Sequence, residues 1–288
     1  MSNNFNDKKS ESFFLWIREL FGKDKPIITM VHLGPLPDDP FYSRENGMKG
    51  LIEGVRQDLY YLQDAGVDAV MFSNENSRPY LTKYGPAAIA AMTRIVTAVL
   101  PEVKVPYGVN VLWDPISTIA IAKAVDAKFV REVFTGVYDS DMGLWNTNCG
   151  EALRYRHQID GDNVKLFYNI HPEFGKALSD RPISEIARTN YISSLPDVIC
   201  VSGAAAGMET STALLKEVKE AVPEVPVFVN TGVNINNVEE QLSIADGAVV
   251  ASSLKIDGDT WKSVDPNRAK EFMSVVRKFR DKLAKKAM

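Results

Sequence analysis

Short apolar runs rich in β-branched residues recur eight times along this chain, and each is followed by a longer segment that suits a helix. The runs cover residues 27–31, 68–72, 105–112, 128–134, 164–170, 197–201, 225–229 and 246–251. Strands that are apolar along their whole length are buried on both faces, which is typical of a parallel sheet covered by helices. Eight strand–helix units in about 250 residues are the count of a (β/α)8 barrel.

The segments between the runs show helical periodicity and helix start signals. In 85–100, Ile89, Met92 and Val96 share one helical face. The last segment begins at Asp265 and Pro266, a capping residue followed by proline. A doubly wound open sheet is the alternative, but it would use about five to seven strands. We therefore predict an α/β protein, a single (β/α)8 TIM barrel over 26–288, with a partly helical N-terminal extension over 1–25.

Composition restricts the class of protein. The net charge of −4 gives no electrostatic reason to expect a nucleic-acid partner. Cys149 and Cys200 are the only cysteines, and the polar N-terminus lacks the apolar stretch of a signal peptide. No run approaches the roughly 20 apolar residues that span a bilayer. The chain is therefore predicted to be cytoplasmic, without a membrane span.

The segment FFLWIRELF, residues 13–21, is short and amphipathic. Contact with a membrane surface is one interpretation of such a segment. We favour packing against the barrel or against a neighbouring subunit. Barrels of this kind often associate, so a homo-oligomer is expected.

Polar residues stand where the predicted strands end, which is where active sites of such barrels lie. His32 follows the first run directly and precedes a loop braced by three prolines. Each of these polar residues could instead have a structural role as the cap of the following helix. For Asp114, which precedes a proline, capping is the favoured interpretation. Arg131 and Glu132 are consecutive in a strand, so they point to opposite faces, and burying either requires a partner. The candidate substrate-binding residues are Asn74, Asn110, Arg131 and Asn169.

The last two strands end in VNTGVN and VASSLKIDG. Barrels of this type frequently bind phosphate with the loops after strands 7 and 8, through backbone N–H groups at a glycine turn and a helix start. The residues predicted to bind phosphate are Ser202, Gly203, Thr231, Gly232, Val233, Ser252 and Ser253.

Several motifs that would indicate a cofactor or a metal are absent from the sequence. It has no nucleotide phosphate loop, no H-E-x-x-H and no C-x-x-C, and SGAAAG at 202–207 lacks the glycine spacing of a dinucleotide fingerprint. A metal site would need His32, His171, Asp114 and Glu132 from different strands. We predict no cofactor and no metal.

The motifs MVHLGPLP, GVNVL, FVR, GEALRYR, NNV and SLKIDG, in this order, resemble the BtpA family over residues 26–280. The family includes proteins tied to photosystem I biogenesis and sgc-region proteins encoded beside sugar phosphotransferase genes. The resemblance implies a phosphate-binding (β/α)8 barrel, and it implies a fold more securely than a reaction.

The chain also departs from the pattern of this family, which makes it a divergent member. The family pattern has Glu-Asn after strand 2, Leu-Arg-Asn-Asp after strand 3, an Asp and a Lys-His pair after strand 5, and Gly-Ser-Gly after strand 7. The corresponding residues are taken to be Ser73-Asn74, Leu112 to Pro115, Asn169 with Glu173 and Phe174, and Asn230 to Gly232. Either the chemistry has been redrawn around His32, His171 and Asp114, or it has been lost.

Two functions from different classes follow. The first is an enzyme that isomerises, cleaves or hydrolyses a phosphorylated sugar or a related small metabolite. Its candidate catalytic residues are His32, Asp114, His171 and Lys255, with a histidine as the acid or base because imidazole titrates near neutral pH. The second is a non-catalytic ligand-binding or assembly factor. The sequence leaves open whether the protein is an enzyme.

Overall fold

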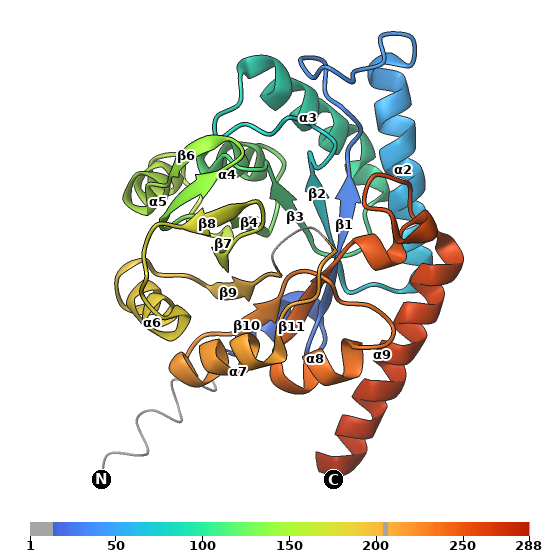
Figure 1. Cartoon of the computed structure of the whole chain (residues 1–288). Coiled ribbons are helices and arrows are strands. Elements are labelled where there is room, and N and C mark those ends of the chain that lie inside the picture. The colour runs from blue at the N-terminus through green and yellow to red at the C-terminus, as the bar shows by residue number, and fades with distance from the viewer. Residues whose placement is uncertain (1–13, 204–206, 288) are drawn as a thin grey trace.

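The computed structural model describes residues 14–203 and 207–287. Its centre is a closed barrel of parallel strands in the order β1-β11-β10-β9-β7-β4-β3-β2 (Figure 1). These strands are β1 (Ile27–His32), β2 (Ala69–Ser73), β3 (Tyr107–Asn110), β4 (Phe129–Glu132), β7 (Lys165–His171), β9 (Val198–Val201), β10 (Val227–Val229) and β11 (Gly247–Val250). Each overlaps one of the eight apolar runs to within a residue at its end, so the predicted (β/α)8 barrel is confirmed.

Helices surround the barrel on its outer side (Figure 1). They are α2 (Gly47–Ala65), α3 (Pro86–Val99), α4 (Pro115–Ala124), α5 (Cys149–Gln158), α6 (Ile183–Ser193), α7 (Thr212–Ala221), α8 (Val238–Ile244) and α9 (Pro266–Ala287). Alternation along the strands separates the core into two layers. In β1, Ile27 and Val31 belong to the layer between strands and helices, whereas Ile28 and Met30 belong to the barrel interior. Both faces of each strand are therefore buried, and this is why the strands appear in the sequence as continuous apolar runs.

A small antiparallel sheet, β6-β5-β8, was not predicted. Its strands β5 (Val137–Ser140), β6 (Gly143–Asn146) and β8 (Gly175–Ala177) come from the loops that follow β4 and β7. They are short and partly exposed, so they carry neither a continuous apolar run nor a clear alternation. Tyr138 and Trp145 of this sheet pack against Trp113, which follows β3, so the sheet is held on the carboxyl side of the barrel.

A helix over residues 14–21 precedes the first strand and packs into the barrel. Ile17 and Phe21 are buried in the interior cluster with Phe129 and Phe167, and the rings of Phe21 and Phe129 are 5.7 Å apart. Phe129 is the first residue of β4, so the helix closes the barrel at the amino ends of its strands. This confirms that FFLWIRELF packs against the barrel, although Phe13 and the rest of the extension before it lie outside the described residues.

Removing the side chain of Ile17 is expected to destabilise the protein measurably. Ile17 is 3% exposed, and Ile17→Ala should lower the free energy of unfolding by about 2 kcal/mol or more through lost burial and a residual cavity. Leu15 on the same helix is 55% exposed and is the matched control, with an expected change within about 0.5 kcal/mol. Urea denaturation of both variants checks this. Equal effects would show that the helix does not close the barrel in solution.

Candidate functional site

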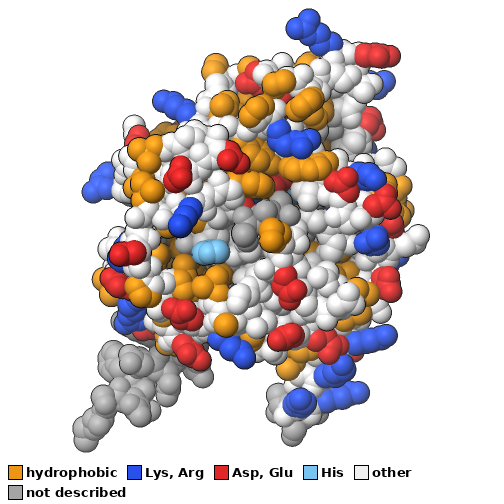
Figure 2. Space-filling view, in the orientation of Figure 1, with side chains coloured by type: hydrophobic (Ala, Val, Ile, Leu, Met, Phe, Trp, Pro, Cys, Tyr) orange, Lys and Arg blue, Asp and Glu red, His pale blue; other side chains and the backbone are white. Residues whose placement is uncertain are grey.

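A cavity of about 390 Å³ opens among the carboxyl ends of the barrel strands. Around this face, acidic and basic side chains are interspersed rather than gathered by sign (Figure 2). The cavity is lined by Met30, His32, Glu75, Trp113, Arg131, Glu173, Phe174, Gly207, Met208, Asn230, Thr231, Gly232, Val233, Asn234, Ala251, Ser252, Ser253, Gly258 and Thr260. Seven of the residues predicted as functional are therefore brought together: His32, Arg131, Thr231, Gly232, Val233, Ser252 and Ser253.

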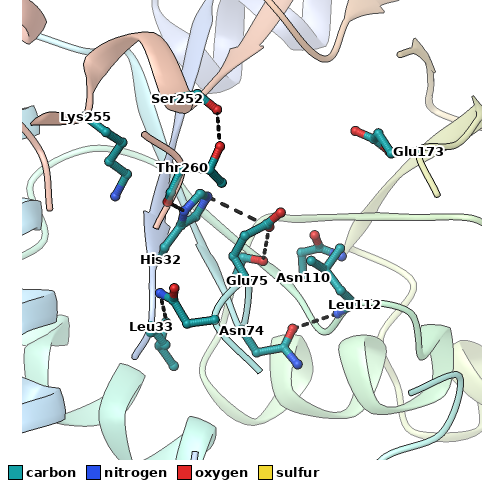
Figure 3. A network of polar contacts seen from close by, with 12 residues as sticks. His32, Leu33, Asn74, Glu75, Asn110, Leu112, Glu173, Ser252, Lys255 and Thr260 are labelled. Atoms are coloured by element: carbon teal, nitrogen blue, oxygen red, sulfur yellow. Dashed lines mark hydrogen bonds and ion pairs between the residues drawn. The ribbon is translucent and has the colours of Figure 1, made fainter. Parts of the chain in front are cut away.

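His32 ends β1 and is held in one orientation inside the cavity wall (Figure 3). Its Nδ1 lies 3.2 Å from the carbonyl oxygen of Thr260. A carbonyl oxygen can only accept, so Nδ1 carries the ring proton and donates a hydrogen bond to that oxygen. Its buried Nε2 has no hydrogen-bond partner among the described residues and lies 3.8 Å from Oε2 of Glu75. Burial, followed by the charge of Lys255, lowers the pKa of His32 well below its ordinary value. His32 is thus a neutral imidazole with a free lone pair beside Glu75.

Glu75 lies two residues beyond the end of β2 and was missed as a site residue. It is 8% exposed and accepts a weak hydrogen bond of 3.4 Å from the hydroxyl of Ser73. Burial raises the pKa of Glu75 to about 7, opposed by the charge of Arg131 and assisted by that of Glu173. A carboxyl group with this pKa can give or take a proton near neutral pH.

The loop after β2 is joined to the segment after His32. Glu75 and Asn76 stand in this loop, directly after Ser73 and Asn74. The amide of Asn76 donates a hydrogen bond to the carbonyl oxygen of Leu33, so Glu75 lies in a loop that is fastened beside the end of β1.

The raised pKa of Glu75 predicts a stability difference that depends on pH. The folded protein holds the proton of Glu75 up to about pH 7, whereas the unfolded chain releases it near pH 4.5. Stability therefore falls as pH rises through this window, by about 3 kcal/mol in total. Glu75→Gln removes this loss, so its stability relative to wild type should increase by about 3 kcal/mol between pH 4 and pH 8. Urea denaturation across this range checks it, and a constant difference would contradict the raised pKa.

Arg131 enters the cavity from β4, while Glu132 points away from it, as the alternation of the strand predicts. The two guanidinium Nη atoms donate to amide oxygens, 2.7 Å to Asn110 and 2.9 Å to Asn230. Asn110 is turned this way because its NH2 group donates to the carboxyl of Glu132 and to the carbonyl of Arg131. Burial raises the pKa of Glu132 well above its ordinary value, and Thr118 of α4 donates to the same carboxyl oxygen as Asn110. Asn110 is therefore a positioning residue rather than part of the cavity wall.

At the end of β7, neither Asn169, predicted to bind substrate, nor His171, predicted to be catalytic, lines the cavity. A register shift between them breaks the alternation of the strand, because Asn169 pairs with Cys200 and His171 with Val201. Nδ1 of His171 contacts the carbonyl oxygen of Ser202 at 2.8 Å, and His171 does not line the cavity. The cavity instead receives Glu173, whose Oε2 accepts a 2.9 Å hydrogen bond from buried Asn169.

The loops after β10 and β11 form the other side of the cavity. The backbone N–H groups of Gly232, Val233 and Ser253 form no hydrogen bond within the described ranges. The hydroxyl of Ser253 donates to the carbonyl of Val233, which ties the two loops together. The hydroxyls of Ser252 and Thr260 are 2.6 Å apart and brace the loop after β11. Free N–H donors at a glycine turn and at the start of a short helix are the chemistry that binds an anion.

Gly232 is required by the backbone of its loop. Its φ of +68° is in the left-handed region, and a Cβ there would lie 2.3 Å from the carbonyl oxygen of Met208 and from Cα of Glu209. A larger residue such as valine would displace that neighbouring loop and disturb the local structure. Ser202 and Gly203, which were predicted to bind phosphate, do not line the cavity. The hydroxyl of Ser202 accepts a hydrogen bond from Asn230, and the backbone N–H of Gly203 donates one to the hydroxyl of Thr231.

Three further predicted residues lie outside the cavity. Asp114 caps α4 through Ser117 and accepts the backbone N–H of Tyr84, so the structure gives it the capping role. Asn74 accepts the backbone N–H of Leu112 at 2.8 Å. Lys255 is 1% exposed and lies on the opposite side of His32 from Glu75 in the view of Figure 3.

The ammonium of Lys255 forms a buried ion pair with Asp58 of α2, at 3.0 Å. The other carboxyl oxygen of Asp58 accepts the backbone N–H of Val264 at 2.9 Å. Lys255 was predicted to be catalytic, but its charge is already paired with a group outside the cavity. Sequence spacing gave no sign of this partner, which is 197 residues away.

Metal-ligating side chains do not cluster in the cavity or elsewhere among the described residues. No cluster of three or more His, Cys, Asp or Glu side chains within residues 14–203 and 207–287 could hold a metal ion. Likewise, no helix in those ranges is both long enough and apolar enough to cross a bilayer. What the cavity presents is a free imidazole nitrogen, a titrating carboxyl group, a guanidinium group and bare backbone donors.

Residues 23–278 match the model of the BtpA family. The chain is 49% identical to the putative sgc region protein SgcQ of Escherichia coli, over 92% of this chain and 99% of that protein. It is 32% identical to the photosystem I biogenesis protein BtpA of Synechocystis, over 90% of each chain. Among solved structures it is similar to (S)-3-O-geranylgeranylglyceryl phosphate synthase from Thermoplasma acidophilum in complex with sn-glycerol-1-phosphate, with a TM-score of 0.55, 13% identity, and coverage of 93% of this chain and 98% of that chain. This last likeness supports the barrel fold alone, whereas the family match and the two relatives extend over almost the whole chain, which therefore belongs to the BtpA family.

Proposed function

We propose that this protein binds a phosphorylated sugar or a related small metabolite in the cavity and transfers protons on it. The observation that carries the proposal is the meeting of two features on one cavity. Free backbone donors lie at the ends of β10 and β11, and the His32–Glu75 pair lies beside them at the ends of the neighbouring strands β1 and β2. The first feature suits a phosphate group, and the second suits acid–base catalysis.

The chemistry of the pair follows from its protonation. His32 offers the Nε2 lone pair and so acts as the base, while Glu75 holds a proton up to about pH 7 and so acts as the acid. Isomerisation and aldol-type cleavage of a phosphorylated sugar both require a base and an acid on one substrate. The phosphate would anchor the ligand, and binding energy gained there would orient the reacting carbon atoms. The structurally similar synthase from Thermoplasma acidophilum was solved in complex with sn-glycerol-1-phosphate, which supports a phosphorylated ligand for a barrel of this fold.

A non-catalytic role is the second candidate. Three of the four residues expected to be catalytic, Asp114, His171 and Lys255, bond elsewhere, and one relative is named for photosystem I biogenesis. In this case the cavity would bind a ligand without converting it. Incubation with a panel of sugar phosphates, followed by product analysis, separates the two candidates.

Thermal unfolding with matched ligands tests the binding step. A sugar phosphate at 100 times its dissociation constant should add about 2.7 kcal/mol to the free energy of unfolding, and the same sugar without phosphate should add almost nothing. Ser252 lines the cavity, so Ser252→Asp, which adds a negative charge, should abolish this effect. Ser252→Asn has nearly the same shape without the charge and should retain it. Equal responses to both sugars, or to both variants, would refute phosphate binding at this position.

A further inference from the structure

The guanidinium group of Arg131 is buried in the cavity wall without a direct counter-ion. Arg131 is 5% exposed, and no carboxylate of the described residues lies within 4.0 Å of its nitrogen atoms. Its two hydrogen bonds go to the neutral amide oxygens of Asn110 and Asn230. Its Nε is buried and has no hydrogen-bond partner among those residues. A guanidinium has five N–H donors, so these bonds leave most of its donors unused.

The two carboxyl groups that line the same cavity are held by other groups. Glu173 accepts from Asn169 at 2.9 Å and from Asn230 at 3.5 Å. Glu75 faces His32. The charge of Arg131 acts on Glu75 across space, but neither carboxyl group occupies the guanidinium donors. A buried charge without a contacting partner is costly, and the amide oxygens hold the planar group in place without neutralising it. The unused donors of Arg131 are therefore suited to an anionic group of the ligand.

We propose that the ligand carries a carboxylate as well as its phosphate, and that Arg131 binds this carboxylate. The substrate class is then a small phosphorylated hydroxy or keto acid. The inference rests on the proposed phosphate site, because it assigns the second anionic end of the same ligand. A planar guanidinium matches a carboxylate with two parallel hydrogen bonds. The cavity volume of about 390 Å³ is near the lower end for ligand pockets, which suits a short carbon chain.

Asn110 and Glu132 take positioning roles under this proposal. Glu132 accepts from the amide of Asn110 and so turns the amide oxygen of Asn110 toward Arg131. Asn230 does the same from the other side, because its NH2 group donates to the hydroxyl of Ser202 at 2.7 Å. The guanidinium is therefore fixed from two strands before any ligand arrives, which limits the ordering needed on binding.

Calorimetric titration of the full chain with matched pairs of probes tests the assignment. One pair is 6-phosphogluconate and sorbitol 6-phosphate, and a shorter pair is 3-phosphoglycerate and glycerol 3-phosphate. The members of each pair differ only in a carboxylate against a CH2OH group. For at least one chain length, the acid should bind at least about tenfold more tightly than the alcohol. Equal affinities within both pairs would overturn the carboxylate inference and leave phosphate binding standing. Binding of no phosphorylated probe would overturn both.

Two variants assign each end of the ligand to its residues. Arg131→Gln, once its folding has been checked by circular dichroism, should reduce the affinity for the acid to that for the alcohol and leave the alcohol unchanged. Ser252→Asp should abolish binding of both members. If Arg131→Gln does not fold, Arg131→Lys is the substitute. Lysine keeps the positive charge but lacks the planar pair of N–H donors, so the ratio of the affinity for the acid to that for the alcohol should decrease. A full preference for the acid in the folded variant would overturn the assignment to Arg131.

Discussion

Replacing His32 by asparagine is expected to lower the turnover of a phosphorylated substrate by about 10²–10⁴-fold, the range typical of a general acid–base group. An asparagine amide can still donate to the carbonyl oxygen of Thr260, as Nδ1 of His32 does. It has no equivalent of Nε2, the atom that faces Glu75. Steady-state kinetics on the substrate identified by the binding screen measures the change, with the loss expected in kcat.

Three measurements control the His32 prediction. The dissociation constant of the substrate should change by only a few-fold, because His32 is not part of the proposed phosphate site. Glu75→Gln should lose turnover to a similar extent. The double variant should be scarcely slower than either single variant, because residues that act as one unit are not additive. Turnover in His32→Asn at the wild-type rate would exclude His32 as the base.

Replacing Lys255 by methionine is expected to lower the free energy of unfolding by about 3–5 kcal/mol. The change leaves the carboxylate of Asp58 buried without its partner, and uncompensated buried charges have costs of this size. The double variant Lys255→Met/Asp58→Asn should recover most of the loss. Its asparagine is neutral and can still accept the backbone N–H of Val264. Urea denaturation of the single and double variants gives both values.

The ion pair of Lys262 and Asp257 is the matched control for Lys255. It is exposed, with 46% and 72% of the two side chains accessible, so Lys262→Met should leave stability nearly unchanged. In the same preparation, folded Lys255→Met should bind phosphorylated ligands as the wild type does. Loss of ligand binding by the folded variant, without loss of stability, would instead return Lys255 to the site.

The barrel could be predicted because its strands are buried on both faces. Continuous apolar runs such as 27–31 and 246–251 carry that information locally, and each run overlaps one strand of the closed sheet. The sheet formed by β5, β6 and β8 could not be predicted in the same way. Tyr138 and Trp145 are buried by contact with Trp113, whereas the residues between them are largely exposed, so no periodic pattern marks these strands.

The residues of the candidate site were located best where their position follows from the course of the backbone. The turn at Gly232 and the paired serines after β11 line the cavity because the strand ends place them there. Side-chain roles were predicted less well, because they depend on distant partners and on local irregularities. The register shift in β7 turns His171 toward Ser202, and Asp58 pairs with Lys255 from a helix far away in the sequence. Glu75 was overlooked because it lies in a loop, two residues past the last residue of its strand.

The central claim is that a phosphate group binds at the ends of β10 and β11. A crystal structure of the protein soaked with 6-phosphogluconate tests this claim most directly. The phosphate oxygens should lie within hydrogen-bonding distance of the backbone N–H groups of Gly232, Val233 and Ser253, inside the cavity that His32 and Glu75 also line. A phosphate bound elsewhere on the protein, or an empty cavity at saturating ligand, would contradict the claim.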